Sequence, residues 1–349
     1  MIHGIFGLYD TTLYQSKPTT NTGLDSVLSL SKQAILTSSY NNRILLKFDI
    51  SSISQSVADN TITNAQYYLN LYTVEAQEVP TTYTVEVYPV SGTWTSGIGK
   101  YSNTPTTTYG ASWLYRDSSP LGTASWDSGV VGGLWNTAYG CSQSYDYSST
   151  DVRVNVTPIV NAWINGVIPN NGFLIKKSNY DETGSYSLFG QLNYFSSDTH
   201  TIYLPKLEVA WDSATFTTGS LTQPQVSKDI TVYIKNLKKA YKETSKARLN
   251  VGVREKYPVI TFATQSNFLE INYLPSSSFF YSIQHADTQE TVIPFDTNYT
   301  KVSCDSNGNF VNLWMDGLQP ERYYKILFRV DRGGAQEYVD NNYIFKIIK

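Results

Sequence analysis

The stretch from Arg43 to Ile50 reads RILLKFDI, and its pattern decides how we expect the first half of the chain to fold. The side chains alternate, with Leu46, Phe48 and Ile50 on one side and Leu45, Lys47 and Asp49 on the other. A period of two residues is typical of a β-strand that packs one face against a core. Arg43 and Asp49 bracket this strand. Catalysis, ligand binding and anchoring of the strand ends are all open roles for them.

The composition favours strands and turns over helices. Charged residues make up only 16% of the 349 residues, whereas Tyr, Thr, Ser and Asn are abundant. Aromatic and β-branched side chains fit a pleated surface, and short polar side chains compete with helical backbone hydrogen bonds. The length is ample for two or three domains, each with its own core. We therefore expect an all-β protein.

Charge and cysteine content exclude several classes of protein. The net charge of -3 argues against a nucleic-acid surface, because such surfaces use lysines and arginines to neutralise phosphates. Cys141 and Cys304 are too few for a disulfide framework or a zinc site, so we expect two unpaired thiols.

The chain shows neither a membrane span nor an export signal. No apolar run approaches the roughly 20 residues that a bilayer requires. The opening MIHGIFGLYD lacks a basic segment followed by an adequate apolar stretch. We expect the chain to fold in the cytoplasm of the producing cell. A Tyr- and Thr-rich β protein made in this way fits one that leaves the cell in a virus particle.

Strand patterns follow one another from about residue 7 to residue 211, with one exception. Residues 93–149 are rich in Gly, Ser, Thr, Trp and Tyr and have weak periodicity, which indicates long surface loops with short strands. An indole ring removes a large apolar area from water when it is buried. We expect burial to hold these loops in place through Trp94, Trp113, Trp126 and Trp135.

A short helix interrupts the strand series near residues 158–165. Thr157 and Pro158 form a typical helix start, with a hydroxyl N-cap and a proline at the first helical position. Gly166 can end the helix in the left-handed conformation. Asn171-Gly172 then predicts a turn before the next strand.

A second strand series begins after a polar stretch. Residues 213–225 read SATFTTGSLTQPQ, and this small, polar composition with Pro224 near the end predicts a linker. About seven short strands follow in residues 226–349, which suits a small β-sandwich. The first domain therefore covers residues 1–212. A basic cluster indicates a solvated loop, although a docking patch for an acidic neighbour stays open: Lys235, Lys238, Lys239, Lys242, Lys246 and Arg248.

No constellation of catalytic or metal-binding residues is evident. His3, His200 and His285 are isolated from other metal-type ligands, and no nucleophile or phosphate-loop motif occurs. Asp181 and Glu182 are adjacent in a turn-like segment, where carboxylates are normally solvated. We therefore expect no catalytic residues, no metal and no cofactor.

Four segments in order resemble the DNRLRE family, a β-sandwich module of the carbohydrate-binding-module type. They are RILLKFD from Arg43, NAQYYLNLY from Asn64, DVRVNVTPIVNAWINGVIPNNGF from Asp151, and LPKLEVAW from Leu204. The resemblance covers about residues 7–212 and implies a jelly-roll-like sandwich. It also implies that the matching residues are framework rather than catalytic: Arg43, Phe48, Asp49, Trp163 and Gly172. Arg43 and Asp49 would then tie strand ends to adjacent loops by charge-assisted hydrogen bonds.

The segment GLQPERYYKILFRV, Gly317 to Val330, resembles the tyrosine corner of fibronectin type III and immunoglobulin-like domains. That resemblance implies that Tyr323 or Tyr324 returns its hydroxyl to the backbone near Leu318. Together, the two modules look like virion structural proteins of tailed bacteriophages.

We therefore expect a non-enzymatic virion component of the neck, collar or tail, assembled with other virion proteins as a symmetric homo-oligomeric ring. One alternative is a carbohydrate-binding adhesion module that contacts host surface glycans, and another is a capsid decoration protein. A hydrolase is a third hypothesis. We expect no nucleic-acid or membrane partner. Glycan or interface contacts are expected from aromatic residues in the loops: Trp113, Tyr115, Tyr145 and Tyr147.

Overall fold

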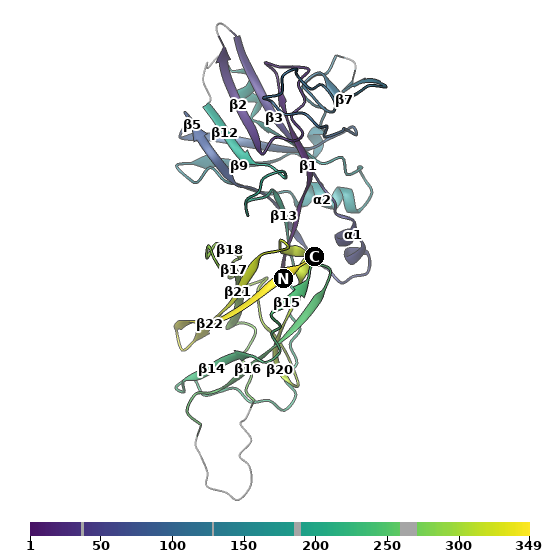
Figure 1. Ribbon diagram of the computed structural model, residues 1–349. Coiled ribbons are helices and arrows are strands. Elements are labelled where there is room, and N and C mark those ends of the chain that lie inside the picture. The colour runs from purple at the N-terminus through teal and green to yellow at the C-terminus, as the bar shows by residue number, and fades with distance from the viewer. Residues whose placement is uncertain (36–37, 128, 185–189, 259–270) are drawn as a thin grey trace, which may run out of the picture. The chain divides into compact units, whose positions relative to one another are not determined.

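The computed structural model describes residues 1–35, 38–127, 129–184, 190–258 and 271–349 (Figure 1). The chain divides into two compact units. The N-terminal unit comprises Ile5–Asp59 and Gln66–Val209, and the C-terminal unit comprises Met1–Gly4, Asn60–Ala65 and Ala210–Lys349. Both units are built from β-strands in sandwich-like sheets, so the expected all-β fold class is confirmed.

The N-terminal unit contains most of the strands and the α-helices. Its strands in chain order are β1 (Ile2–Tyr14), β2 (Val27–Ile35), β3 (Ser38–Phe48), β4 (Gln66–Leu71), β5 (Thr73–Gln77), β6 (Thr82–Pro89), β7 (Tyr115–Ser119), β8 (Gly122–Ser125), β9 (Cys141–Asp146), β10 (Val152–Asn155), β11 (Phe173–Lys177), β12 (Gly190–Phe195) and β13 (Lys206–Ala210). The helices are α1 (Ser51–Ala58), α2 (Thr157–Ile164), α3 (Asn179–Thr183) and the 3-10 turn η1 (Thr137–Tyr139).

Strand β3, which carries RILLKF, connects the two layers of the N-terminal unit. Its second half, from Asn42 to Phe48, pairs with β1, and β11 pairs with Leu46, Leu45 and Ile44 on its other side. Its first half, from Ser38 to Asn41, pairs instead with β2. One layer therefore runs β10-β4-β13-β1-β3-β11-β6-β9, and the other continues from β3 through β2 and β12 to β5.

Both faces of β3 are buried in the structure, whereas the sequence pattern predicts that only one face is buried. Ile44, Leu46 and Phe48 are buried in the core of the sandwich, as expected. Leu45, on the opposite face, is also fully buried. It belongs to a second apolar cluster that also contains Leu13, Leu174, Val90, Ala111, Trp94, Trp113 and Trp126. The prediction that tryptophans hold residues 93–149 in place by burial is thereby confirmed for these three, and Trp135 is half-buried against the same cluster.

The short helix occurs where the sequence predicts it, as α2. Trp163 on this helix is buried and packs on Phe173, with 4.7 Å between ring centroids. The expected N-cap is wrong. Val156 occupies the cap position, and the Thr157 hydroxyl instead accepts a hydrogen bond from the Tyr67 backbone N–H on β4, 2.9 Å away. Because that hydroxyl is already committed to a neighbouring strand, it is not available to cap the helix.

The C-terminal unit is a sandwich of a four-stranded and a five-stranded sheet. The first has the order β14-β16-β20-β19 and the second β15-β22-β21-β17-β18. The strands are β14 (Ile230–Ile234), β15 (Ala240–Lys242), β16 (Lys246–Glu255), β17 (Phe279–His285), β18 (Thr291–Ile293), β19 (Ser303–Asp305), β20 (Gly308–Trp314), β21 (Tyr323–Arg332) and β22 (Ala335–Ile348), with the 3-10 turn η2 (Met315–Gly317).

A single apolar cluster fills the space between these two sheets. Phe279, Tyr324 and Phe345 are among its buried residues. Of the two tyrosines proposed for a corner, Tyr324 donates its hydroxyl to the Gln319 carbonyl at 3.0 Å, while Tyr323 is exposed. The assignment of this sandwich to the fibronectin type III or immunoglobulin class stays a prediction.

The segment predicted as a linker packs on the C-terminal unit. Phe216 forms a parallel bridge with Cys304, and Thr222 forms another with Asn272. These bridges use backbone hydrogen bonds and no side chains. The polar composition of the segment therefore does not reveal them. Cys141 and Cys304 are both unpaired thiols, which confirms that prediction.

Gly172 offers a test of the turn that precedes β11. Its φ is +89°, and an added Cβ would lie 2.5 Å from the Leu46 carbonyl oxygen. We expect Gly172→Ala to lower the free energy of unfolding by more than the roughly 1–2 kcal/mol of left-handed strain alone. Gly166→Ala is the matched control, because Gly166 has φ +68° and no atom within 4 Å of the added Cβ. Equal losses in chemical denaturation would contradict the role of the Leu46 contact.

Asp10 offers a test of pH-dependent stability. Burial raises the pKa of its carboxyl from 3.8 to about 7, against the stabilising hydrogen bond from the Ser197 backbone N–H. Because the folded protein binds this proton more tightly than the unfolded chain does, protonation of Asp10 stabilises the folded state. This stabilisation is complete below pH 3.8 and is lost as the pH rises through about 7. We expect Asp10→Asn to remove this decline, measured by denaturant unfolding from pH 4 to pH 8. Parallel curves for the two proteins would contradict the buried titration.

Candidate functional site

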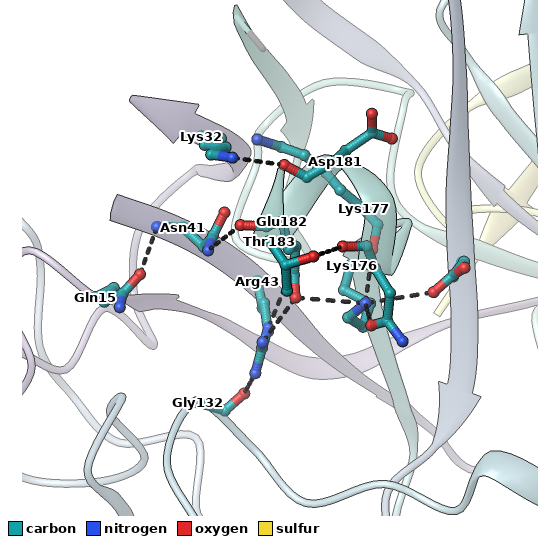
Figure 2. A network of polar contacts seen from close by, with 12 residues as sticks. Gln15, Lys32, Asn41, Arg43, Gly132, Lys176, Lys177, Asp181, Glu182 and Thr183 are labelled. Carbon is teal, nitrogen blue, oxygen red and sulfur yellow. Dashed lines mark hydrogen bonds and ion pairs between the residues drawn. The ribbon is translucent and has the colours of Figure 1, made fainter. Parts of the chain in front are cut away.

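Arg43 joins three parts of the N-terminal unit that are distant in sequence. From β3, its Nε and Nη2 atoms donate to Glu182 Oε1 at 2.9 Å and to Oε2 at 2.7 Å, and its Nη1 donates to the Gly132 carbonyl at 2.8 Å (Figure 2). Both charged side chains are largely buried, with 11% and 5% of their areas exposed. A bidentate arginine–carboxylate pair is among the stronger and more directional polar contacts.

A second cation completes this network. Lys176, on β11, donates to Glu86 Oε2 at 3.3 Å and to Asn179 Oδ1 at 2.9 Å, and its Nζ lies 3.4 Å from Glu182 Oε2. Glu182 therefore pairs with two cations inside the protein. The expectation that its carboxylate is solvated is wrong, because α3 folds back over the sheet and places Glu182 beside Arg43 and Lys176.

Two indole rings flank the Arg43 guanidinium. Its Cζ lies 4.9 Å from the ring centroid of Trp113 and 4.9 Å from that of Trp135. Gly132 lets the loop approach, since a Cβ there would lie 2.7 Å from Arg43 Nη1 and from the Trp113 ring. The cation–π contacts and the hydrogen bonds together fix the guanidinium in one orientation.

Two further lysines lie near α3. Lys32, on β2, donates to the Asp181 carbonyl at 2.8 Å, as Figure 2 shows. It also donates to the Gly184 carbonyl at 2.6 Å, so it holds this helix against the sheet. Burial lowers the pKa of Lys177 from 10.5 to about 6, which favours its neutral amine, although the nearby Glu182 carboxylate acts in the opposite direction. Glu182 is therefore the carboxylate that pairs with the two buried cations, Arg43 and Lys176.

The other framework residues lie apart from this network. Asp49 is exposed and accepts a hydrogen bond from the Ser51 backbone N–H at 3.0 Å, at the start of α1. Phe48 and Trp163 pack on opposite parts of Phe173 in the core. Arg43 and Asp49 bracket one strand but therefore perform separate tasks.

The aromatic residues proposed for ligand contacts differ in exposure. Trp113 and Tyr145 are buried, with 5% and 2% of their areas exposed, so little ring surface is left for a ligand. Tyr145 stacks on Tyr83 at 4.4 Å between centroids. Tyr115 is half-buried, and Tyr147 is 84% exposed directly after β9, at one end of the antiparallel β6–β9 pair. The structure does not bring these four side chains into one site.

A patch that combines rings with polar groups lies directly beside the buried network. We call Tyr88, Trp135, Glu86 and Asn179 the ring patch. Its two rings are half-buried with centroids 6.2 Å apart, and the Tyr88 hydroxyl donates to Glu86 Oε2 at 3.2 Å. Burial, and then the Glu86 carboxylate, raises the pKa of Tyr88, which keeps this hydroxyl protonated. Asn179 is exposed beside Lys176.

The sheet register explains why the ring patch forms. Glu86 lies opposite Lys176 in the β6–β11 pair, and Tyr88 is two residues further along the same face. Trp135 reaches the patch because its backbone bridges to Val90, just beyond β6. The alternation of β6 indicates which residues face outward, but the position of Trp135 depends on a pairing that the loop sequence does not signal.

Neither a cluster of metal-ligand side chains nor a membrane-spanning helix is found in the described part of the chain. Its residues include no group of three or more His, Cys, Asp or Glu side chains placed to hold a metal ion. Among the same residues, no helix is long and apolar enough to cross a bilayer.

The comparison with protein families finds a match to carbohydrate-binding module family 96 over residues 7–120. The match lies almost wholly in the N-terminal unit and covers about a third of the chain. It supports the N-terminal unit as a β-sandwich of the carbohydrate-binding-module type. The matched range includes Arg43, Glu86, Tyr88 and Trp113, whereas Trp135 and Glu182 lie outside it.

Solved structures give only distant similarity. A β-glucuronidase of Parabacteroides merdae is 9% identical with a TM-score of 0.18, over 81% of this chain and 28% of that one. A putative β-galactosidase of Bacteroides fragilis is 9% identical with a TM-score of 0.20, over 97% and 41%. The chain therefore spans less than half of either enzyme, and similarity this low carries no functional argument. The search of curated proteins finds no match.

Replacing Arg43 tests the buried network. We expect Arg43→Met to lower the free energy of unfolding by about 3 kcal/mol, at the lower end for breaking a buried pair because Lys176 still faces Glu182. Arg153→Met is the control, since 54% of the Arg153 side chain is exposed. Its partner Glu208 would still have a cation nearby, because Lys206 Nζ lies 3.9 Å from Glu208 Oε2. That control should cost less than about 1 kcal/mol. Similar losses in denaturant titrations would show that burial does not distinguish the two pairs.

Proposed function

We propose that the chain is a non-catalytic carbohydrate-binding protein whose N-terminal unit binds surface glycans. The observation that carries this proposal is the match of residues 7–120 to carbohydrate-binding module family 96. Glycan binding was the alternative prediction from the sequence, and the match favours it over the virion role.

The chemistry of the ring patch suits a sugar ligand. Sugars present apolar C–H faces that pack on aromatic rings, and hydroxyl groups that pair with carboxylates and amides. The ring patch offers Trp135 and Tyr88 for packing, and Glu86 and Asn179 for hydrogen bonds. Arg43 and Lys176 lie behind the patch and hold these groups before a ligand arrives, which lowers the entropy that binding must overcome.

We also propose that the chain is located on a tailed-phage particle. A glycan-binding unit on a phage particle would contact the host surface, and many copies on a symmetric ring would strengthen weak individual contacts. Mass spectrometry of purified particles tests this location. Detection of the chain at a fixed copy number supports it, and absence from the particles contradicts it while leaving glycan binding untouched.

We also propose that the chain does not hydrolyse the polysaccharides that it binds. Incubation of the full chain with each polysaccharide that it binds should release no reducing ends. An increase in reducing ends with time would instead favour the hydrolase hypothesis.

Substitutions in the ring patch test the site. We expect Trp135→Ala to weaken binding of the full chain to its polysaccharide ligand by roughly tenfold, since an aromatic contact of this size contributes about 1–1.5 kcal/mol. Binding is measured by affinity electrophoresis against a polysaccharide panel and then by calorimetry. The melting temperature of each variant is measured in parallel, because Trp135 also contacts Arg43.

Tyr147→Ala is the matched control, since Tyr147 is an exposed aromatic at the other end of the β6–β9 strand pair. Loss of binding by the Trp135 variant alone supports the ring patch. Loss by the Tyr147 variant alone moves the site to that other end of the pair. A chain that binds no polysaccharide in the panel contradicts the proposed function.

A further inference from the structure

The outer face of the four-stranded sheet in the C-terminal unit carries a row of cations. On β16, Lys246 and Arg248 are exposed, whereas Leu249 and Val251, on the opposite face of the strand, are buried in the core. Successive side chains of a strand point to opposite faces, so Lys246 and Arg248 project from the outer face together. Along a strand, residues two apart are separated by about 6.8 Å.

The segment between β14 and β16, which includes β15 of the five-stranded sheet, brings further lysines close to Lys246 and Arg248. Lys235, Lys238 and Lys242 are all exposed. A hollow of about 450 Å³ is lined by Lys238, Lys242, Lys246 and Arg248, together with uncharged residues. A second hollow of about 320 Å³ is lined by Lys235 and Arg248, with Asp305 and several asparagines. Arg248 borders both, so the two hollows form one continuous basic surface.

This surface is poorly neutralised by the protein itself. Arg248 pairs with Asp305. Among residues that the structure describes, Lys235, Lys238, Lys242 and Lys246 have no carboxylate within ion-pair distance. Glu243 is the acidic residue that the sequence places between positions 235 and 248. We call Lys235, Lys238, Lys242, Lys246 and Arg248 the basic face.

The aromatic rings below the basic face are already covered. Lys246 Nζ lies 3.7 Å from the ring centroid of Trp314, and Arg248 Cζ lies 3.6 Å from that of Phe310. Both rings come from β20, which pairs directly with β16. Because a cation lies over each of these rings, less indole and phenyl surface is left on which a sugar ring can pack. The arrangement favours charge recognition over sugar stacking.

We propose that the basic face is a docking surface for an extended acidic segment of a partner protein. An extended peptide repeats its side chains on one side every two residues, which matches the spacing of Lys246 and Arg248. Carboxylates at alternate positions would therefore meet these two cations in register, while Lys238 and Lys242 contact the flanking residues. Such charge contacts raise the association rate and the specificity of binding, and added salt weakens them. This partner is separate from the glycan proposed for the N-terminal unit.

The test uses the full chain and a synthetic peptide of alternating Glu and Ser, labelled for fluorescence anisotropy at low ionic strength. We expect Lys242→Gln combined with Lys246→Gln to weaken peptide binding roughly tenfold. Lys228→Gln combined with Lys325→Gln is the charge-matched control, because these lysines pair with Glu255 and Asp340 elsewhere in the unit. The control should bind as the unmodified chain does, and added salt should weaken both.

Three outcomes would overturn the proposal. The first is no binding of the peptide at low ionic strength. The second is equal weakening by the two double variants, which would indicate net charge rather than a defined surface. The third is tighter binding of polygalacturonate than of the peptide through Lys242 and Lys246, which would assign the basic face to an acidic glycan. Melting temperatures are expected to stay unchanged, since the replaced side chains are exposed or paired only at the surface.

Discussion

The Arg43–Glu182 pair is the contact on which the N-terminal unit depends. It joins a central strand to α3 and, through the Gly132 carbonyl, to the loop that carries the tryptophans. Isolated burial of either charge would be costly, because each loses its hydration. Bidentate hydrogen bonds, a second cation and two flanking rings offset that cost. The network therefore fixes the relative positions of segments that share no backbone pairing.

The same network explains why a binding patch can form on a loop-rich face. Loops alone place side chains imprecisely, and ligand affinity suffers when binding must order them. Here Trp135 contacts Arg43 from outside, and Glu86 pairs with Lys176. The proposed sugar contacts thus rest on buried charges rather than on flexible connections. This also means that stability and binding are coupled at Trp135, which is why the two must be measured together.

Cations on aromatic rings occur in both units but with different consequences. Around Arg43, the rings and the carboxylate enclose the guanidinium charge, so this charge contributes to folding and not to binding a partner. On the basic face, Lys246 and Arg248 lie over rings and remain exposed to solvent. Lys246 therefore offers its charge to a partner protein, whereas Arg248 already pairs with Asp305. The difference follows from burial, since an enclosed cation must be neutralised internally and an exposed one need not be.

The sequence by itself determined the all-β class, the core side of RILLKFDI, the position of the helix near Trp163 and the turn at Asn171-Gly172. These features depend on local periodicity and on backbone geometry, which neighbouring residues specify. Tertiary structure alone decided that Leu45 is buried, that Thr157 bonds to Tyr67 instead of capping a helix, and that Glu182 lies beneath the surface. It also placed Trp135 next to Tyr88. In each case the partner is remote in sequence, and no local pattern records which distant group will satisfy a charge, a hydroxyl or a ring.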